Sequence, residues 1–265
     1  MPAQSFDTDK YGISSLDIPR EIRIHRTTED INGLFPLYDL LELQTTAGSI
    51  NAIISPQPGN KTAVLRIKSQ SGDLYVHFLR RAFDSCGQRL EGEEHIKSPA
   101  ERTYDTSIET TTNHIMGEIM QGGGLDGGGR TSISATTGMV DIRVFPVSDA
   151  MPSSLNTSTT TGIHMIDVKP PLCGDQPTLA NLSATHRSKS SGILDLTYPL
   201  EWEGWAHVRG EKAPLFLRLA GEGRDTFLIH RAGRASYIAR TRDSNKLKGV
   251  DIIAEGTGRA MFRAG

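Results

Sequence analysis

A repeated pattern of turn and apolar residues constrains the fold of this chain more than any other feature. Each unit is anchored on a Gly or Asn, and apolar residues recur at positions +2, +4 and +6 after the anchor, as in Gly48-Ser-Ile-Asn-Ala-Ile-Ile54. Residues two apart point to the same face of a strand, and an apolar face must be buried. Ser or Thr residues precede most anchors, which is typical of tight turns. We therefore predict that each unit is a strand, a turn and a second strand.

The spacing of the anchors distinguishes between two all-β folds. The anchors are Gly48, Gly72, Asn113, Gly138, Gly162 and Gly192, so the spacings are 24, 41, 25, 24 and 30 residues. A unit of this length cannot bury its own apolar face, so neighbouring units must stack on one another. We predict an all-β, single-domain stacked-repeat β-solenoid, and a β-sandwich of hairpins is the alternative.

The same pattern divides the chain into regions. Residues 1–34 are interpreted as a polar N-terminal arm, and residues 35–265 as the β-repeat domain. The long spacing of 41 indicates an insertion, which we place at 82–102 because this stretch is polar and lacks alternation. Residues 202–265 keep the alternation but lose the turn motif, so they are predicted to be degenerate repeats that cap the stack.

Charge and cysteine content exclude several classes of protein. The net charge is −2, and no basic run with interleaved aromatic residues predicts a nucleic-acid partner. No apolar signal-peptide core or membrane-spanning stretch is visible, so we expect a cytoplasmic protein without a membrane span. Cys86 and Cys173 form no C-x-x-C pair and are expected to be reduced thiols. The sequons at Asn60, Asn156 and Asn181 would matter only in a secreted chain.

Several segments of the repeat resemble a known family. Thr45–Ala52, Lys68–Leu74 and Ala135–Ile142 are similar to "toastrack" or putative-adhesin repeats, and Leu194–Gly204 is similar to a segment of their uncharacterised fungal members. The resemblance covers roughly residues 35–265. It implies a β-solenoid-like domain of unknown function, and it supplies no catalytic residues.

Motifs for cofactors and metals give weak signals. Residues 122–127 satisfy G-x-G-x-x-G, but the next repeat strand follows them where a dinucleotide site needs a helix. We interpret this run as a loop between repeats. The histidines show no zinc-binding spacing, and His164, at an inward position, is interpreted as a hydrogen-bonded or rim residue. No cofactor and no metal are predicted.

Two outward columns of the predicted solenoid carry charged residues. Asp141 and Asp195 fall in the +3 column two rungs apart, about 9–10 Å, which is the limit for an inverting glycosidase pair. Glu118, Arg143 and Asp167 fall in the +5 column of three successive rungs. Opposite charges on neighbouring strands hold their register, so we interpret these three residues as a structural ladder.

Tyr198, Trp202 and Trp205 form the main concentration of aromatic residues. They can be a binding platform or a cap over the last rung, and the cap is the preferred interpretation. The preferred function is a non-catalytic β-repeat scaffold or protein-interaction module of unknown partner. The alternatives are a carbohydrate- or surface-binding adhesin-like module and, least favoured, a solenoid enzyme acting on polysaccharide. The partner is thus a protein or a glycan, and the oligomeric state is not predicted.

Overall fold

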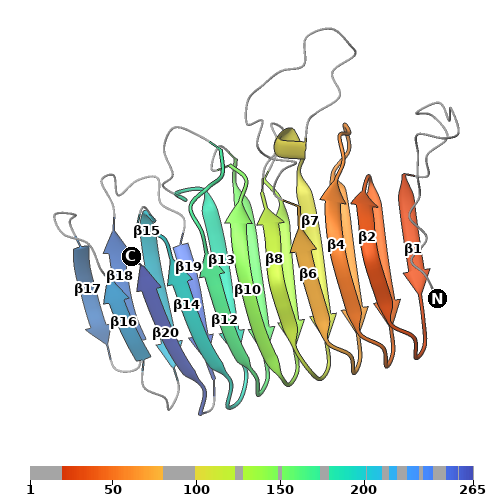
Figure 1. Cartoon of the computed structure of the whole chain (residues 1–265). Coiled ribbons are helices and arrows are strands. Elements are labelled where there is room, and N and C mark those ends of the chain that lie inside the picture. The colour runs from red at the N-terminus through yellow and green to blue at the C-terminus, as the bar shows by residue number, and fades with distance from the viewer. Residues whose placement is uncertain are drawn as a thin grey trace, which may run out of the picture.

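The computed structural model consists mainly of β-strands in two sheets. It describes residues 20–79, 99–122, 128–148, 151–173, 179–200, 202–210, 215–219, 226–232, 235–240, 249–255 and 257–264. Figure 1 shows the strands standing side by side, from β1 at one end of the molecule to β17 at the other. No helix among the described residues is long and apolar enough to cross a membrane.

The two sheets are referred to as sheet A and sheet B. Sheet A contains, in spatial order, β1 (Glu21–His25), β3 (Leu40–Thr45), β5 (Ala63–Ser69), β7 (Tyr104–Thr110), β9 (Arg130–Ala135), β11 (Ser153–Thr159), β13 (Leu182–Ser188), β19 (Gly249–Ala254), β15 (Gly204–Gly210), β18 (Ala235–Arg240) and β17 (Thr226–Ala232). Sheet B contains β16 (Leu215–Leu219), β20 (Arg259–Ala264), β14 (Ile193–Tyr198), β12 (Ile163–Val168), β10 (Met139–Pro146), β8 (Ile115–Gln121), β6 (Leu74–Phe78), β4 (Ile50–Pro56) and β2 (Ile31–Leu37). One strand from each sheet makes a rung.

The register of the strands confirms the predicted solenoid. Each strand from β1 to β14 pairs in parallel with the strand two places away in the sequence, whereas a sandwich of hairpins would pair consecutive strands antiparallel. The +2 residues stack directly on one another through sheet B. They are Ile50, Leu74, Ile115, Val140, His164 and Leu194, and all are buried. The predicted inward face is therefore the core.

The anchor glycines are required mainly because successive turns stack closely. A Cβ added to Gly72 would lie 1.7 Å from the carbonyl oxygen of Gly48, the preceding anchor. Positive φ angles, a common reason for glycine or asparagine in a turn, occur among the anchors at Asn113 (80°) and Gly138 (109°). The contact between turns, rather than the left-handed conformation, explains the glycine at Gly72.

The hydroxyl residues before the anchors satisfy the backbone of the turn. Thr45 Oγ1 accepts a hydrogen bond from the Gly48 N–H at 3.1 Å, and Ser69 Oγ accepts one from the Gly72 N–H at 2.8 Å. Both hydroxyls are buried beneath the turn. A buried N–H without a partner costs free energy, so these residues make the turn compatible with a closely packed interior.

The predicted regional boundaries need correction at the N-terminus. β1 and β2 form the first rung, so the polar arm expected at 1–34 cannot extend beyond residue 20. The insertion lies between β6 and β7 as the spacing indicated, and its residues 80–98 are outside the described part. The short 3₁₀ turn η3 (Pro99–Glu101) leads from it into β7. Residues 123–127 of the glycine-rich motif are also outside the described part.

The cysteine prediction was wrong. Cys173 is disulfide-bonded, and it also forms a parallel bridge with Ser148 next to the rungs of β10 and β12. The sequence contains one other cysteine, Cys86, which lies outside the described residues. Disulfides persist in oxidising environments, so the expectation of reduced thiols does not hold for Cys173.

The order of the last rungs differs from the order of the sequence. After β14, the chain forms β15 and β16 and then the antiparallel strands β17 and β18. β19 then lies between β13 and β15, and β20 lies between β14 and β16 (Figure 1). We call Gly249–Ala264 the C-terminal rung. Residues 202–265 therefore do not cap the stack as a block, because their last part is an internal rung.

The C-terminal rung contributes to the core like any other rung. Phe262 is buried, and its ring centroid lies 5.2 Å from that of Tyr198 and 5.3 Å from that of Trp202. Aromatic rings packed at these distances contribute beyond the area that they bury. Phe262 is thus the largest of the buried side chains through which the C-terminal rung packs into the interior.

We predict that Phe262→Ala lowers the free energy of unfolding by about 3–5 kcal/mol, because it removes a large buried ring and leaves a cavity. Urea denaturation followed by far-ultraviolet circular dichroism measures the change. The half-buried neighbour Met261 is the matched control, and Met261→Ala should cost about 1 kcal/mol. An equally small effect at Phe262 would mean that the C-terminal rung is a loosely attached tail.

Candidate functional site

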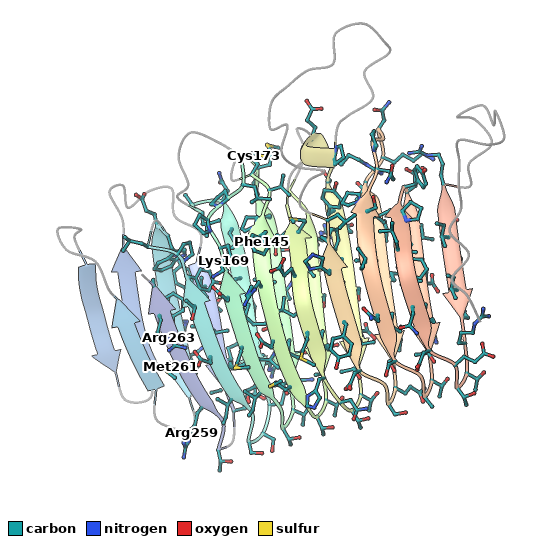
Figure 2. All side chains as sticks on the ribbon, in the orientation of Figure 1. Phe145, Lys169, Cys173, Arg259, Met261 and Arg263 are labelled. Carbon is teal, nitrogen blue, oxygen red and sulfur yellow. The ribbon has the colours of Figure 1, made fainter. Side chains whose placement is uncertain are left out.

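The outer face of sheet B is organised by charge. Arg143 on β10 is in register with Glu118 on β8 and with Asp167 on β12, as the +5 column predicted. Arg143 Nη1 lies 3.2 Å from Glu118 Oε1, and Asp167 pairs instead with Lys169 at 2.5 Å. Figure 2 labels Lys169 on this face. The predicted ladder forms between Glu118 and Arg143, whereas Asp167 pairs with a residue just beyond the end of its own strand.

The two aspartates of the +3 column do not form a pair of equivalent carboxylates. The register places Asp141 and Asp195 two rungs apart, with Met165 between them. Asp195 forms an ion pair with Arg263 of β20, a residue labelled in Figure 2. A general base needs a carboxylate that can approach a water molecule, whereas Asp195 is held by a cation. Among the described residues there is also no cluster of three His, Cys, Asp or Glu suited to a metal ion.

The outer face of sheet A has a different chemistry. On its central strands β7, β9, β11 and β13, Asp105, Glu109, Arg130 and Arg187 hold four outward positions, and short uncharged polar side chains hold the others, in register from strand to strand. We call this set the hydroxyl face, and it consists of Ser107, Ser132, Ser134, Ser154, Asn156, Ser158, Ser183 and Thr185. All eight are half-buried or exposed, and none has a side-chain hydrogen bond to another described residue. Their donors and acceptors therefore face solvent.

Charged pairs mark two sides of the hydroxyl face. Lys68 and Glu109 approach to 3.2 Å on the side of β5 and β7. Arg187 and Glu255 form an ion pair on the side of the C-terminal rung. The centre between these pairs carries no ionised side chain on β11, where Ser154, Asn156 and Ser158 alternate with buried residues.

Trp205 lies next to the hydroxyl face on the same side of sheet A. Its side chain is half-buried, and its six-membered ring covers Gly249, where an added Cβ would lie 2.2 Å from Cζ2. Asp251, two residues beyond Gly249, is in register with Thr185 of the hydroxyl face. Asp251 Oδ1 lies 3.2 Å from His207 Nδ1. An aromatic ring, a carboxylate and the hydroxyl array thus form one continuous surface.

The predicted aromatic platform is wrong for two of its three residues. Tyr198 and Trp202 are buried in the core, where their rings pack against Phe262. A platform needs a ring face that a ligand can reach, and only Trp205 of the three has an accessible side chain. The preferred interpretation, a cap over the last rung, also needs correction, because the C-terminal rung covers Tyr198 and Trp202 and makes them core residues.

Two histidines lie inside the solenoid. His186 on β13 is fully buried, with Nδ1 2.8 Å from Thr157 Oγ1 and Nε2 2.9 Å from the Tyr198 hydroxyl. His164 on β12 is also fully buried, and neither of its ring nitrogens has a hydrogen-bond partner. The inward position of His164 was predicted, but the expectation that it is satisfied or on the rim was wrong.

Burial keeps both histidines neutral. Loss of hydration lowers the pKa of His164 from 6.5 to about 4. Burial, with a smaller contribution from the charge of His164, lowers the pKa of His186 to about 3. Both residues are ordinary bases in the unfolded chain. Below pH 6.5 the unfolded state therefore binds protons that the folded state does not bind. The free energy of unfolding consequently decreases as the pH is lowered.

We predict that this protein loses stability between pH 6.5 and pH 5, by up to about 1.4 kcal/mol per pH unit for each of the two histidines. His164→Leu should reduce the slope, because one titrating group is gone, and should stabilise the protein at pH 5. Denaturant unfolding at a series of pH values, for wild type and variant, measures both effects. Parallel curves for the two proteins would contradict the assignment to His164.

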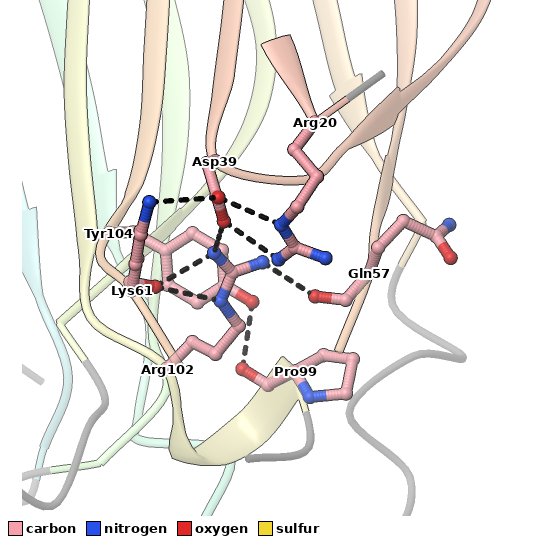
Figure 3. Close-up of polar contacts among 7 residues, drawn as sticks. All are labelled: Arg20, Asp39, Gln57, Lys61, Pro99, Arg102 and Tyr104. Carbon is pink, nitrogen blue, oxygen red and sulfur yellow. Dashed lines mark hydrogen bonds and ion pairs between the residues drawn. The ribbon is translucent and has the colours of Figure 1, made fainter. Parts of the chain in front are cut away.

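A buried arginine joins the corners at one end of the solenoid (Figure 3). The side chain of Arg102, which precedes β7, is fully buried. Its Nη1 donates to the Gln57 carbonyl at 2.7 Å, and its Nη2 donates to the Lys61 carbonyl at 2.8 Å and to Asp39 Oδ1 at 3.3 Å. Arg20 binds both Asp39 oxygens at 2.8 Å. We call Arg20, Asp39, Lys61 and Arg102 the corner cluster.

The corner cluster stabilises the fold by binding groups of the protein itself. The hydrogen bonds from Arg20 hold the pKa of Asp39 below its usual value, and burial lowers the pKa of Arg102. Each nitrogen of the Arg102 guanidinium already donates to a carbonyl or a carboxylate. The arrangement therefore closes successive corners and commits every nitrogen of Arg102 to the protein itself.

We predict that Arg102→Met lowers the free energy of unfolding by about 3 kcal/mol, because two corner carbonyls and Asp39 lose a buried donor. Arg143→Met is the matched control: Arg143 is exposed, and its pair should contribute less than about 1 kcal/mol. Thermal and urea denaturation of the two variants give the comparison. Equal losses of stability in the two variants would show that the buried Arg102 stabilises the fold no more than the exposed Arg143 does.

Sequence reasoning missed three of these features. Arg102 was assigned to the polar insertion because its neighbours are charged, and no periodicity marks it as buried. His186 lies outside the anchor frame of the second strands. The contact of Trp205 with Gly249 joins residues from different rungs. Its one trace in the sequence is a glycine at the start of a strand, which can mark a place where another group approaches the backbone closely.

Comparisons with known proteins add no assignment. No family model, curated protein or solved structure matches the chain. The resemblance to toastrack repeats therefore stays a prediction from sequence, and the site must be judged by its geometry.

Proposed function

We propose that this protein is a non-catalytic, adhesin-like binding module that holds an uncharged glycan chain against the outer face of sheet A. Trp205 is the stacking platform, and the hydroxyl face supplies hydrogen bonds to the sugar hydroxyls. The observation that carries the proposal is the accessible indole over Gly249, continuous with an array of hydroxyl and amide side chains that have no hydrogen-bond partner among the described residues.

The chemistry of the surface fits that of a sugar. A pyranose ring has an apolar C–H face, which packs on an aromatic ring, and hydroxyls around its edge. Serine, threonine and asparagine side chains both donate and accept hydrogen bonds, so they match hydroxyls without needing a charge. Rungs about 4.8 Å apart repeat the same groups across the strands, which suits a polymer lying across the sheet.

The cysteine chemistry supports the surface-exposed version of this function over the cytoplasmic one. A disulfide such as the one at Cys173 is typical of proteins that mature in oxidising compartments. The Asn156 sequon lies in the hydroxyl face itself, so a glycan attached there would cover the proposed site. Binding should therefore be measured on protein made without N-glycosylation.

A protein partner is the second candidate, and a separate observation favours it. Leu34, Ile53 and Tyr75 are 61%, 40% and 41% exposed on the outer face of sheet B. Leu34 is in register with Ile53, so their side chains are neighbours on adjacent strands. Clustered exposed apolar residues are a common feature of protein interaction surfaces. This keeps the scaffold interpretation open for sheet B.

The two candidates separate with one pair of variants. We predict that unglycosylated wild type binds members of a panel of neutral polysaccharides and a glycan array, and that Trp205→Ala lowers the affinity at least about tenfold, a loss of about 1.4 kcal/mol. Tyr75→Ala is the matched control, because it removes an exposed ring from the other sheet. Circular dichroism checks that both variants fold.

Placing a long cation in the hydroxyl face gives an independent test. Ser132→Arg should block binding, since Ser132 is exposed at the centre of the array. Retention of glycan by both Trp205→Ala and Ser132→Arg would contradict the proposed surface. Failure of wild type to bind any glycan in the panel would contradict the proposed function itself.

A further inference from the structure

We propose that the C-terminal rung is exchanged between two copies of this chain, producing a reciprocally swapped dimer. The inference rests on the order of the strands and is independent of the glycan proposal.

The C-terminal rung occupies a slot between two other rungs. In sheet A, β19 pairs in parallel with β13 on one side and with β15 on the other. In sheet B, β20 pairs in the same way with β14 and β16. Without this rung, four strands would each present an unpaired edge, which is an unfavourable and reactive state for a sheet.

The walls of the slot come from earlier parts of the chain. β13 and β14 precede β15 and β16 in the sequence, and the strands β17 and β18 follow before the C-terminal rung begins. The rung cannot be laid down in sequence order on the growing end of the stack. It must instead enter between elements that are already formed or that open to admit it.

The C-terminal rung itself carries the side chains that hold it in the slot. Val250, Ile252 and Phe262 fill the core, Asp251 contacts His207 of the slot, and Glu255 and Arg263 form ion pairs with Arg187 and Asp195. The rung thus binds through residues on both sides and in both sheets. Figure 2 shows Arg259, Met261 and Arg263 following one another along β20.

The slot is selective for this segment. Gly249 is needed beneath Trp205, because any Cβ there would collide with the indole. Phe262 fits between Tyr198 and Trp202. An unrelated strand would lack these features, whereas the rung of a second copy has all of them. A second copy therefore makes the same contacts as the chain's own rung, and the balance between the two depends on concentration.

Cross-linking of co-refolded variants tests the exchange directly. Thr185 on β13 and Asp251 on β19 are in register on the outer face of sheet A, within the Cα separation that a disulfide spans. Chains carrying Thr185→Cys are mixed with chains carrying Asp251→Cys, unfolded together, refolded at high concentration and oxidised. We expect a disulfide-linked heterodimer, detected by non-reducing electrophoresis and mass spectrometry.

Two controls make the result decisive. A mixture of Asn156→Cys and Thr185→Cys chains probes β11 and β13, which are in register within one copy and should give no cross-linked heterodimer. A single chain carrying both Thr185→Cys and Asp251→Cys, refolded at low concentration, should cross-link as a monomer, which shows that the site can oxidise. The native cysteines are present in every sample and contribute equally.

The oligomeric state of the wild type gives the second measurement. Light scattering should find a dimer whose fraction rises with the protein concentration during refolding and persists on later dilution, because release requires removal of the rung. The tryptophan emission of monomer and dimer should be the same, since Trp202 and Trp205 both contact the rung in either form. A cross-linked double variant together with only monomeric wild type and no heterodimer would overturn the proposal.

Discussion

The stacking of equivalent residues on one another is the constraint on which the rest of this structure depends. A single rung buries one row of apolar side chains only if another rung covers it, so every rung needs a neighbour with the same spacing. Parallel pairing in register meets this need, because Ile50, Leu74 and Ile115 occupy equivalent places in successive strands. The close approach of the turns follows from the same stacking, and it limits the anchors to residues without a bulky side chain.

Polar groups are tolerated inside this stack to different degrees. Thr45 and Ser69 satisfy turn amides, and Arg102 satisfies corner carbonyls, so their burial is matched by hydrogen bonds. His164 has no such partner and stays neutral only because its pKa is lowered. The side chains inside the stack are therefore regular in position but differ in how well their polar groups are satisfied, and His164 is one whose burial no hydrogen bond offsets.

The sequence predicted what is periodic and missed what is not. The solenoid, the inward columns and the register of Arg143 with Glu118 and Asp167 follow from alternation and anchor spacing, which are local properties. The corner cluster depends on contacts between residues 63 positions apart, from Asp39 to Arg102, and no period marks such contacts. Of the three aromatic residues that the sequence suggested as a platform, only Trp205 is accessible. Alternation could not show this, because it does not reveal that the C-terminal rung covers Tyr198 and Trp202.

The position of the C-terminal rung shows how far sequence order and spatial order can separate in a repeat protein. A solenoid built strictly in order needs only nearest-neighbour contacts, and each new rung adds to an existing edge. Here the rung that completes the sheets is made last and touches both the seventh rung of the stack, β13–β14, and the rung beyond it. The C-terminal rung therefore joins two parts of the stack, β13–β14 and β15–β16, that do not pair with each other. Gly249 of the same rung lies beneath Trp205, so the C-terminal rung helps to position the ring of the proposed glycan site.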